Sequence, residues 1–348
     1  MSSAITSENQ PKAVRLRDAL RAFGLLALGS VLLLLAAWAT AALYFDVRVP
    51  WLRVPLATAY AVAVSASAVF LFVTRPWLAV GLSTGSFALV LGWWLNLKPS
   101  NDRDWQPDVA VLAYADINGT KVRIHNIRNC EYRTETDFDV RHYDKTFDLD
   151  QLREANLYMV YWGSPNIAHT MISFGFESDA YLCFSIETRK RKGQAYSAVR
   201  GLFRQFELTY VVADERDVIR LRTNFRQGED AYLYRLNASP AQVRTLFLDY
   251  LRRLNSLRQR PEWYSALTHN CTTSIRTQRA AADRTPWDWR LLVNGRGDEL
   301  LYARGLIATN LPLPALKEKC HINARARAAD KATDFSRLIR LDIPGITP

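Results

Sequence analysis

The sequence predicts an α+β protein in which three N-terminal transmembrane helices precede one water-soluble domain. Two observations lead to this prediction. Three long runs within the first hundred residues contain no charged side chain, whereas the remaining residues, about 250, combine short alternating apolar runs with an amphipathic helix. Strands followed by helices, rather than a regular alternation of the two, are typical of the α+β class.

The three uncharged runs are Ala22–Phe45, Val54–Thr74 and Pro76–Leu97, with lengths of 24, 21 and 22 residues. Each can cross the roughly 30 Å hydrocarbon layer as a helix that keeps its backbone hydrogen bonds internal. The first run exceeds the apolar stretch of a cleavable secretion signal, which holds about 7 to 15 residues. We therefore expect a cytoplasmic tail at residues 1–21 and three spanning helices within residues 22–97.

The distribution of basic residues predicts the orientation. Four basic residues precede the first span, namely Lys12, Arg15, Arg17 and Arg21. Because excess Lys and Arg stay in the cytoplasm, the N-terminus should lie inside, and three crossings then place the C-terminal domain outside. Arg48 and Arg53 in the next loop weigh against this orientation. We expect a multi-pass protein of the cytoplasmic (inner) membrane.

The net charge of +11 is spread along the chain. No basic stripe suggests nucleic acid, so anionic membrane lipids are the expected partners. The one compact basic cluster runs from Arg189 to Lys192 and fits either a solvated loop or a headgroup or substrate contact. Four cysteines without CxxC spacing, and five histidines without an HExxH motif, predict no metal site and no cofactor. Outside the cytoplasm, Cys130 and Cys320 could form a disulfide.

The soluble part divides by composition. Residues 98–108 form a polar linker, residues 109–320 the domain, and residues 321–348 a tail rich in Arg and Ala, which is a surface helix or has no fixed structure. Within the domain, residues 167–235 have the pattern of a strand meander. Ser239 starts a helix that continues through Leu257, because Pro follows it at the first helical position and Gln at the third.

The stretch from Ala168 to Lys190 has the alternation of a β-hairpin with a turn at residues 177–179. Its apolar side chains occupy even-numbered positions on both arms, namely Ile172, Phe174, Phe176, Leu182, Phe184 and Ile186. If the hairpin is only structural, its other face is expected to carry polar residues on a solvent-exposed surface.

The hairpin register brings a histidine and a carboxylate together. Burying the even-numbered residues on one face requires an odd loop length. A three-residue loop places Phe176 opposite Ala180 and His169 opposite Glu187, whereas a five-residue loop places Ser185 opposite His169. Opposed side chains have Cβ atoms about 4.5 to 5.5 Å apart, so a carboxylate there can orient an imidazole.

A cysteine in a polar setting supplies the matching nucleophile. Cys271 lies between Asn270 and Thr272, and the residues that follow predict a helix that begins near it. A helix N-terminus lowers the pKa of a thiol and offers N–H groups to an oxyanion. His269 is a rival base, while Cys183, between apolar neighbours, fits a buried structural thiol.

These patterns predict a site with Cys271 as nucleophile, His169 as base and Glu187 as the orienting residue. Ser185 or an Asn could orient the imidazole instead of Glu187. Further substrate-binding or orienting candidates are Ser185, Asn270, Thr272 and Arg189.

Four runs carry a resemblance to a known family. They are Ile167–Phe176, Ser185–Lys190, Asp214–Thr223 and His269–Thr273. Together they resemble the Lnb N-terminal periplasmic domain family, over roughly residues 100–310. The resemblance implies a permuted papain-like or NlpC/P60-type thiol fold, in which the histidine strand precedes the cysteine helix. It also implies the roles given above for Cys271, His169 and Glu187.

Some members of this family are linked to acyl-chain remodelling of lipoproteins. The resemblance therefore implies a membrane-anchored cysteine acyltransferase or hydrolase that acts outside the cytoplasmic membrane on lipoprotein or lipid acyl groups. This chain departs from the family in having a three-helix anchor before the domain and no long helical membrane region after it. The alternatives are a cell-wall cysteine peptidase or amidase, and a non-enzymatic membrane scaffold.

Overall fold

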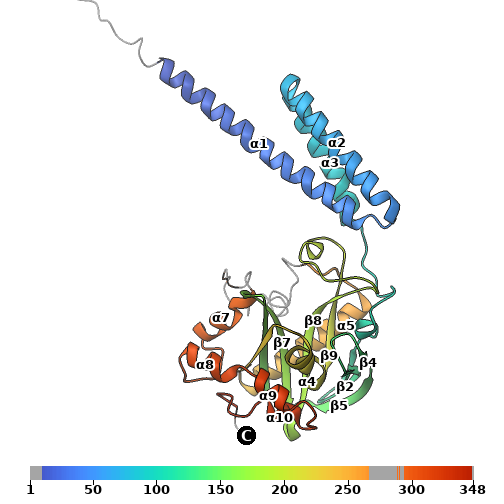
Figure 1. Cartoon of the computed structure of the whole chain (residues 1–348), viewed down its shortest axis with the longest axis vertical. Helices are drawn as coiled ribbons and strands as arrows, with labels where there is room; N and C mark the ends of the chain where they lie inside the picture. Colours follow the sequence, from blue (N-terminus) through green and yellow to red (C-terminus); the bar gives the residue numbers. More distant parts are fainter. Residues whose placement is uncertain (1–9, 266–287, 289, 291–293, 347–348) are drawn as a thin grey trace, which may run out of the picture. The chain divides into compact units, whose positions relative to one another are not determined.

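The chain forms two compact units, Met1–Lys98 and Pro99–Pro348. Figure 1 shows the computed structural model, which describes residues 10–265, 288, 290 and 294–346. The first unit is helical and the second combines a large sheet with helices, so the predicted α+β class is confirmed.

The first unit contains α1 (Gln10–Asp46), α2 (Pro50–Thr74) and α3 (Pro76–Leu95). Each contains a segment long and apolar enough to cross a membrane, and only 6 to 17% of the residues in these segments are buried. Their apolar side chains therefore face outward, as lipid requires. The three predicted helices are confirmed, although α3 ends two residues before the end of its uncharged run, which extends to Leu97.

Aromatic contacts pack α1 against α3 in this unit. The Trp38 ring meets those of Phe87 and Trp94 edge to face, at centroid distances of 5.7 and 5.2 Å. The Trp94 indole N–H also donates to Asp46 Oδ2 at 2.7 Å, at the end of α1. That hydrogen bond satisfies a carboxylate that is itself buried.

The second unit is built on an eight-stranded sheet with strand order β1-β2-β9-β8-β7-β6-β10 and β5 paired to β2. Every pairing is antiparallel except that of β2 with β9. The strands are β1 (Tyr114–Asn118), β2 (Lys121–Arg128), β5 (His142–Asp148), β6 (Leu152–Trp162), β7 (Ser164–Phe176), β8 (Ala180–Arg189), β9 (Glu207–Ala213) and β10 (Glu229–Arg235). A separate small ladder joins β3 (Glu131–Tyr132) and β4 (Phe138–Asp139).

The helices of this unit are α4 (Glu215–Arg220), α5 (Pro240–Gln259), α7 (Gly297–Ala303), α8 (Leu313–Cys320), α9 (Asn323–Ala328) and α10 (Phe335–Leu338). The π-helix η5 (Leu221–Phe225) continues α4 directly. Short 3₁₀ turns are η1 (Pro107–Val109), η2 (Leu149–Gln151), η3 (Glu177–Asp179), η4 (Arg200–Leu202) and η8 (Asn294–Arg296). The predicted strand meander is thus interrupted by α4 and η5, because the apolar positions of residues 215–225 follow a helical period.

Helix α5 covers one face of the sheet. The Ser239 side chain accepts from the backbone N–H of Gln242, and the Gln242 side chain accepts in return, which completes the predicted capping box. Phe247 of α5 packs on Phe174 and Phe184, with ring centroids 4.9 and 6.0 Å apart. The even-numbered face of the hairpin is therefore the core face, as predicted.

The opposite face is also buried, so the expected wet surface was wrong. Residues 168–176 of β7 are all buried, because α4 and the C-terminal helices cover this second face. Glu215 of α4 accepts from the Tyr158 hydroxyl at 2.8 Å and from both terminal nitrogens of Arg340, at 2.6 and 2.7 Å. Buried carboxylates on this face are thus paired with arginines from distant segments.

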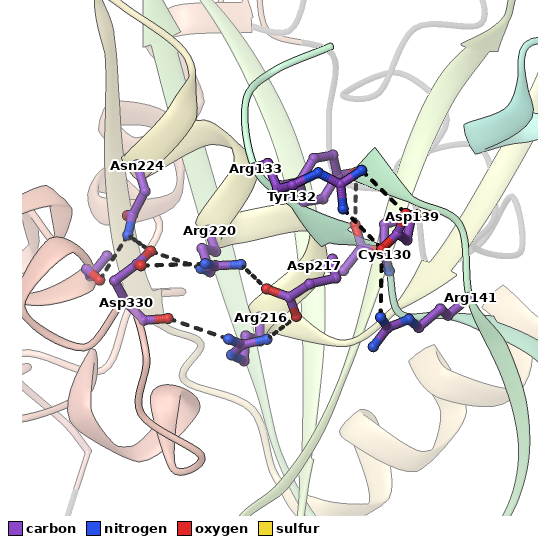
Figure 2. A network of polar contacts seen from close by, with 12 residues as sticks. Cys130, Tyr132, Arg133, Asp139, Arg141, Arg216, Asp217, Arg220, Asn224 and Asp330 are labelled. Atoms are coloured by element: carbon purple, nitrogen blue, oxygen red, sulfur yellow. Dashed lines mark hydrogen bonds and ion pairs between the residues drawn. The ribbon is translucent and has the colours of Figure 1, made fainter. Parts of the chain in front are cut away.

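A second buried carboxylate, Asp217, anchors the start of the β3–β4 ladder. Arg128 binds it through two hydrogen bonds of 2.9 and 2.7 Å, and the backbone N–H of Cys130 donates to it at 2.7 Å. Figure 2 shows Arg220 and Asn224 meeting Asp330 close by. The network joins α4 to residues early and late in the domain.

The C-terminal residues belong to this core, so the tail predicted at residues 321–348 does not stand apart from the domain. Ile322, Phe335 and Ile339 are at most 1% exposed. The Arg-rich composition does not indicate this burial, because Arg340 pairs with the buried Glu215 and Arg327 donates to Thr223 O. The predicted polar linker is likewise part of the domain: Trp105 is buried, and Asn101 donates to the carbonyls of α5.

The cysteines in the described part of the chain form no disulfide. Cys130, Cys183 and Cys320 are buried free thiols, so the pairing considered for Cys130 with Cys320 is wrong. Burial raises the pKa of both Cys130 and Cys320 to about 12, and it raises that of Cys183 well above the usual value. All three are inert packing residues.

Replacing Arg340 should test whether the C-terminal segment holds the domain together. In Arg340→Met the Glu215 carboxylate stays buried without its partner, so the free energy of unfolding should fall by about 3–5 kcal/mol. The matched control is Arg337→Met, which removes an exposed pair with Asp334 and should cost less than about 1 kcal/mol. Pulse proteolysis of the detergent-solubilised chain across a urea series measures both. Equal effects would contradict a role for the buried pair.

Candidate functional site

The β7–β8 hairpin has the register that its alternation predicts. Phe176 pairs with Ala180 across the three-residue turn η3, and the ladder runs to Met171 opposite Ser185. Continued by two residues, the same register brings His169 opposite Glu187. The three-residue loop is therefore correct, and the five-residue alternative is excluded.

His169, Ser185 and Glu187 meet on the odd-numbered face. Nε2 of His169 lies 2.7 Å from Ser185 Oγ and 3.1 Å from Glu187 Oε1. The Ser185 hydroxyl donates to the same Glu187 oxygen at 2.6 Å. Ser185 and Glu187 thus both contact Nε2 of His169, whereas the sequence predicted either one or the other as the orienting residue.

The hydrogen bonds assign the tautomer of His169. The single hydroxyl proton of Ser185 goes to Glu187, so Ser185 Oγ accepts from His169, and Nε2 carries a proton. In the neutral ring the basic lone pair is then on Nδ1. Nδ1 is the nitrogen that can take a proton from a nucleophile.

An arginine that the sequence patterns did not single out completes the cluster. Arg222 of η5 lies 3.3 Å from Glu187 Oε1 and 3.3 Å from Glu229 Oε2 at the start of β10. Its side chain is only 9% exposed. π-helical turns recur at functional sites, and Arg222 falls inside the Asp214–Thr223 run that carries the family resemblance, which was the available signal.

The charges around Glu187 keep it ionised. Burial by itself would raise its pKa, but His169, Arg222 and the Ser185 hydroxyl outweigh burial and hold the pKa of Glu187 well below its usual value. The carboxylate therefore stays negative at neutral pH and can accept the Nε2 hydrogen of the neighbouring imidazole. This arrangement fits an imidazole base oriented by a carboxylate.

Arg189 does not join this cluster. Its side chain is buried and donates to the carbonyls of Val109 and Ala110 and to Asn101 Oδ1. The guanidinium also lies over the Trp105 ring at 4.2 Å. Arg189 fixes the segment that leads into the domain, which is a structural role different from the substrate contact considered for it.

The predicted nucleophile Cys271, with Asn270, Thr272 and the rival base His269, lies outside the described residues. The described residues on either side of this stretch return to the same end of the sheet. Before it, Trp263 forms a bridge with Glu207 at the start of β9. After it, Gly295 packs against the start of β7, where an added Cβ would lie 2.3 Å from Pro165 O.

A pocket of about 460 Å³ opens at this end of the sheet. Its walls include the aromatic residues Tyr161, Trp162 and Tyr232, together with Asp230, Arg296 and Lys317. Tyr161 packs against the core as well as lining the pocket, whereas Trp162 is exposed. Across the described residues, no group of three or more His, Cys, Asp or Glu side chains is arranged to hold a metal ion.

Comparison with known proteins gives one family. Residues 139–295 match the family model described as the Lnb N-terminal periplasmic domain, the family that the sequence motifs resemble. No curated protein and no solved structure matches the chain. The matched segment contains His169, Ser185, Glu187 and Arg222. With three helices long and apolar enough to cross a membrane, and with residues 139–295 similar to the Lnb N-terminal periplasmic domain, the chain fits a membrane-anchored protein that has a domain outside the cytoplasm.

Proposed function

We propose that this protein is a cysteine acyltransferase or hydrolase of the cytoplasmic (inner) membrane, with three crossings and its domain outside. The observation that carries the proposal is the oriented imidazole: Nε2 of His169 is held by Ser185 and Glu187. Cys271 is the proposed nucleophile. A permuted papain-like arrangement, in which the histidine strand precedes the cysteine helix, is part of the proposal.

The places where the chain leaves and rejoins the described domain support the role of Cys271. Trp263 pairs with Glu207, which itself pairs with Arg189, two residues from Glu187 on β8. The Tyr161 hydroxyl donates to Gly295 O at 3.0 Å, beside the start of the His169 strand. The described residues Trp263 and Gly295, which precede and follow Cys271 in the sequence, thus both lie at the sheet end that carries His169.

The proposed reaction begins with attack of the Cys271 sulfur on an ester or amide carbonyl. His169 Nδ1 takes the thiol proton, and backbone N–H groups at the predicted helix start hold the oxyanion. When the carbon–oxygen or carbon–nitrogen bond breaks, His169 returns the proton to the leaving group and a thioester remains. An amine then takes the acyl group in transfer, or water takes it in hydrolysis, and the thiol is restored.

Membrane anchoring favours a lipid-borne acyl donor, such as a lipoprotein or a lipid, over a soluble peptide. A tethered domain meets substrates of its own membrane at high effective concentration. The same chemistry would serve a cell-wall peptidase or amidase. A non-enzymatic scaffold is the alternative in which the hairpin only packs.

Alkylation with iodoacetamide near neutral pH distinguishes an enzyme from a scaffold. In the folded chain Cys271 should react, because an imidazole base promotes its thiolate. Cys130, Cys183 and Cys320 are internal controls that should react only after denaturation, since they are buried and their pKa values are raised. His169→Ala should slow the Cys271 reaction at least about tenfold. Labelling of Cys271 only after denaturation would favour the scaffold.

Substitutions in the hairpin rank the partners of His169. Glu187→Gln should slow Cys271 labelling more than Ser185→Ala, because Glu187 Oε1 lies 3.1 Å from Nε2 and can hold the ring without the hydroxyl. Glu187→Gln should also change the pH profile of labelling, since this substitution removes the negative charge beside the imidazole. Glu177→Gln in the exposed turn is the matched control and should leave rate and profile unchanged. A larger effect of Ser185→Ala would reverse the proposed order.

Mass spectrometry of cells with and without Cys271→Ala separates the substrates. For an acyltransferase, lipoproteins from the variant should lose the acyl group on their N-terminal amine, while the peptides of the cell wall stay unchanged. The opposite pattern, with altered wall peptides and normal lipoproteins, would replace the proposed substrate by the wall. Glu177→Gln again serves as the control strain.

A further inference from the structure

The loop between β8 and β9, residues 190–206, combines exposed apolar side chains with basic charge. Tyr196, Val199 and Leu202 are 48, 56 and 43% exposed. From Lys190 to Phe206 the sequence contains five basic residues and no acidic one, the basic ones being Lys190, Arg191, Lys192, Arg200 and Arg204. Lys192 pairs with Asp104, whereas Arg200 is exposed beside the apolar tip. Exposed apolar side chains beside basic charge are typical of surfaces that meet anionic lipid.

Packing and hydrogen bonds hold the β8–β9 loop in one conformation. Phe203 and Phe206 are buried beneath it, and the Tyr196 ring lies 6.0 Å from that of Phe206. The backbone N–H of Gly201 donates to Ser197 O at 2.9 Å, which closes the tip. The loop therefore presents its exposed apolar side chains on a fixed frame.

The base of the loop is bound to the segment that leaves the membrane anchor. Lys192 N donates to Asp104 O, and Gln106 N donates to Lys190 O, both at 2.9 Å. Asp104 follows Leu95, the last residue of α3, by nine positions. A chain of that length reaches at most about 30 Å, so the covalent connection limits how far Asp104, which is bonded to the base of the loop, can lie from the end of α3.

The two ends of the sheet differ in the exposed side chains that they carry. At the loop end, Trp162 at the end of β6 and Ile167 near the start of β7 are 38 and 48% exposed. The opposite end carries the turn Glu177–Asp179 and the acidic residue Asp150 of η2. Figure 1 shows the β8–β9 loop rising above the ends of β8 and β9. Exposed apolar groups thus gather at the end that also holds His169.

We propose that the β8–β9 loop docks on a bilayer containing anionic lipid, with Tyr196, Val199 and Leu202 inserted among the headgroups. The basic residues of the loop then lie at the level of the phosphates. Docking orients the end of the sheet that holds His169 and the Tyr161–Trp162 pocket toward the lipid. The proposal rests on the anchor and the loop, and it holds whether or not Cys271 is a nucleophile.

Photocrosslinking in the full chain tests the proposal. Benzoylphenylalanine replaces Tyr196 in one variant and Leu341, an equally exposed apolar residue far from the loop in sequence, in the control. After reconstitution into vesicles of phosphatidylcholine with phosphatidylglycerol, irradiation should attach lipid at position 196 and not at 341. Mass spectrometry of the digested chain detects the adduct.

The charge of the loop gives a second readout. Arg200→Glu, combined with the photoreactive residue at position 196, should lower the lipid adduct, by about fivefold for each unit of charge where docking is incomplete. Vesicles of phosphatidylcholine alone should lower it as well. The proposal is overturned if position 196 gives no lipid adduct, if it crosslinks to protein instead, or if positions 196 and 341 label equally.

Discussion

The register of the β7–β8 hairpin is the constraint on which the domain depends. Because strand side chains alternate, the pairing that sends Phe174 and Phe184 into the core beneath α5 also sends His169, Ser185 and Glu187 to the other face. A shift by one residue would exchange the two sets and leave polar groups inside the aromatic core. The stability of the core thus fixes the geometry of the candidate site, and the aromatic packing acts as its support.

Covering the second face of the sheet brings carboxylates into the interior, and arginines from far along the chain neutralise them. Arg128 binds Asp217, Arg222 binds Glu187, and Arg340 binds Glu215. Replacing such pairs with apolar residues is often neutral or stabilising, so we interpret them as devices that select one arrangement of segments rather than as the main source of stability. The same α4–η5 segment supplies Asp217, Glu215 and Arg222, which couples the structural pairs to the candidate site.

Local patterns predicted the features whose signals are local. The length of the uncharged runs predicted the three helices, and the capping box at Ser239 predicted α5. The alternation of apolar side chains predicted the hairpin and the contact of His169 with Glu187. Features that depend on distant partners were not predicted. In the sequence Arg189 resembles a surface cation, but in the fold its side chain donates to the carbonyls of Val109 and Ala110. The C-terminal residues have the composition of a tail, but Arg340 donates to the buried Glu215. Arg222 was not predicted for the same reason, because its place in the candidate site depends on its contact with Glu187, which lies 35 residues earlier on β8.

The pairing of Glu215 with Arg340 also bears on the order in which the domain can fold. The two residues are 125 positions apart, and Glu215 is enclosed by Tyr158 and the sheet. A nascent chain synthesised only through α5 would hold this carboxylate without its counterion. The second face of the sheet therefore cannot be completed strand by strand during synthesis, and its completion waits for the segment around Arg340.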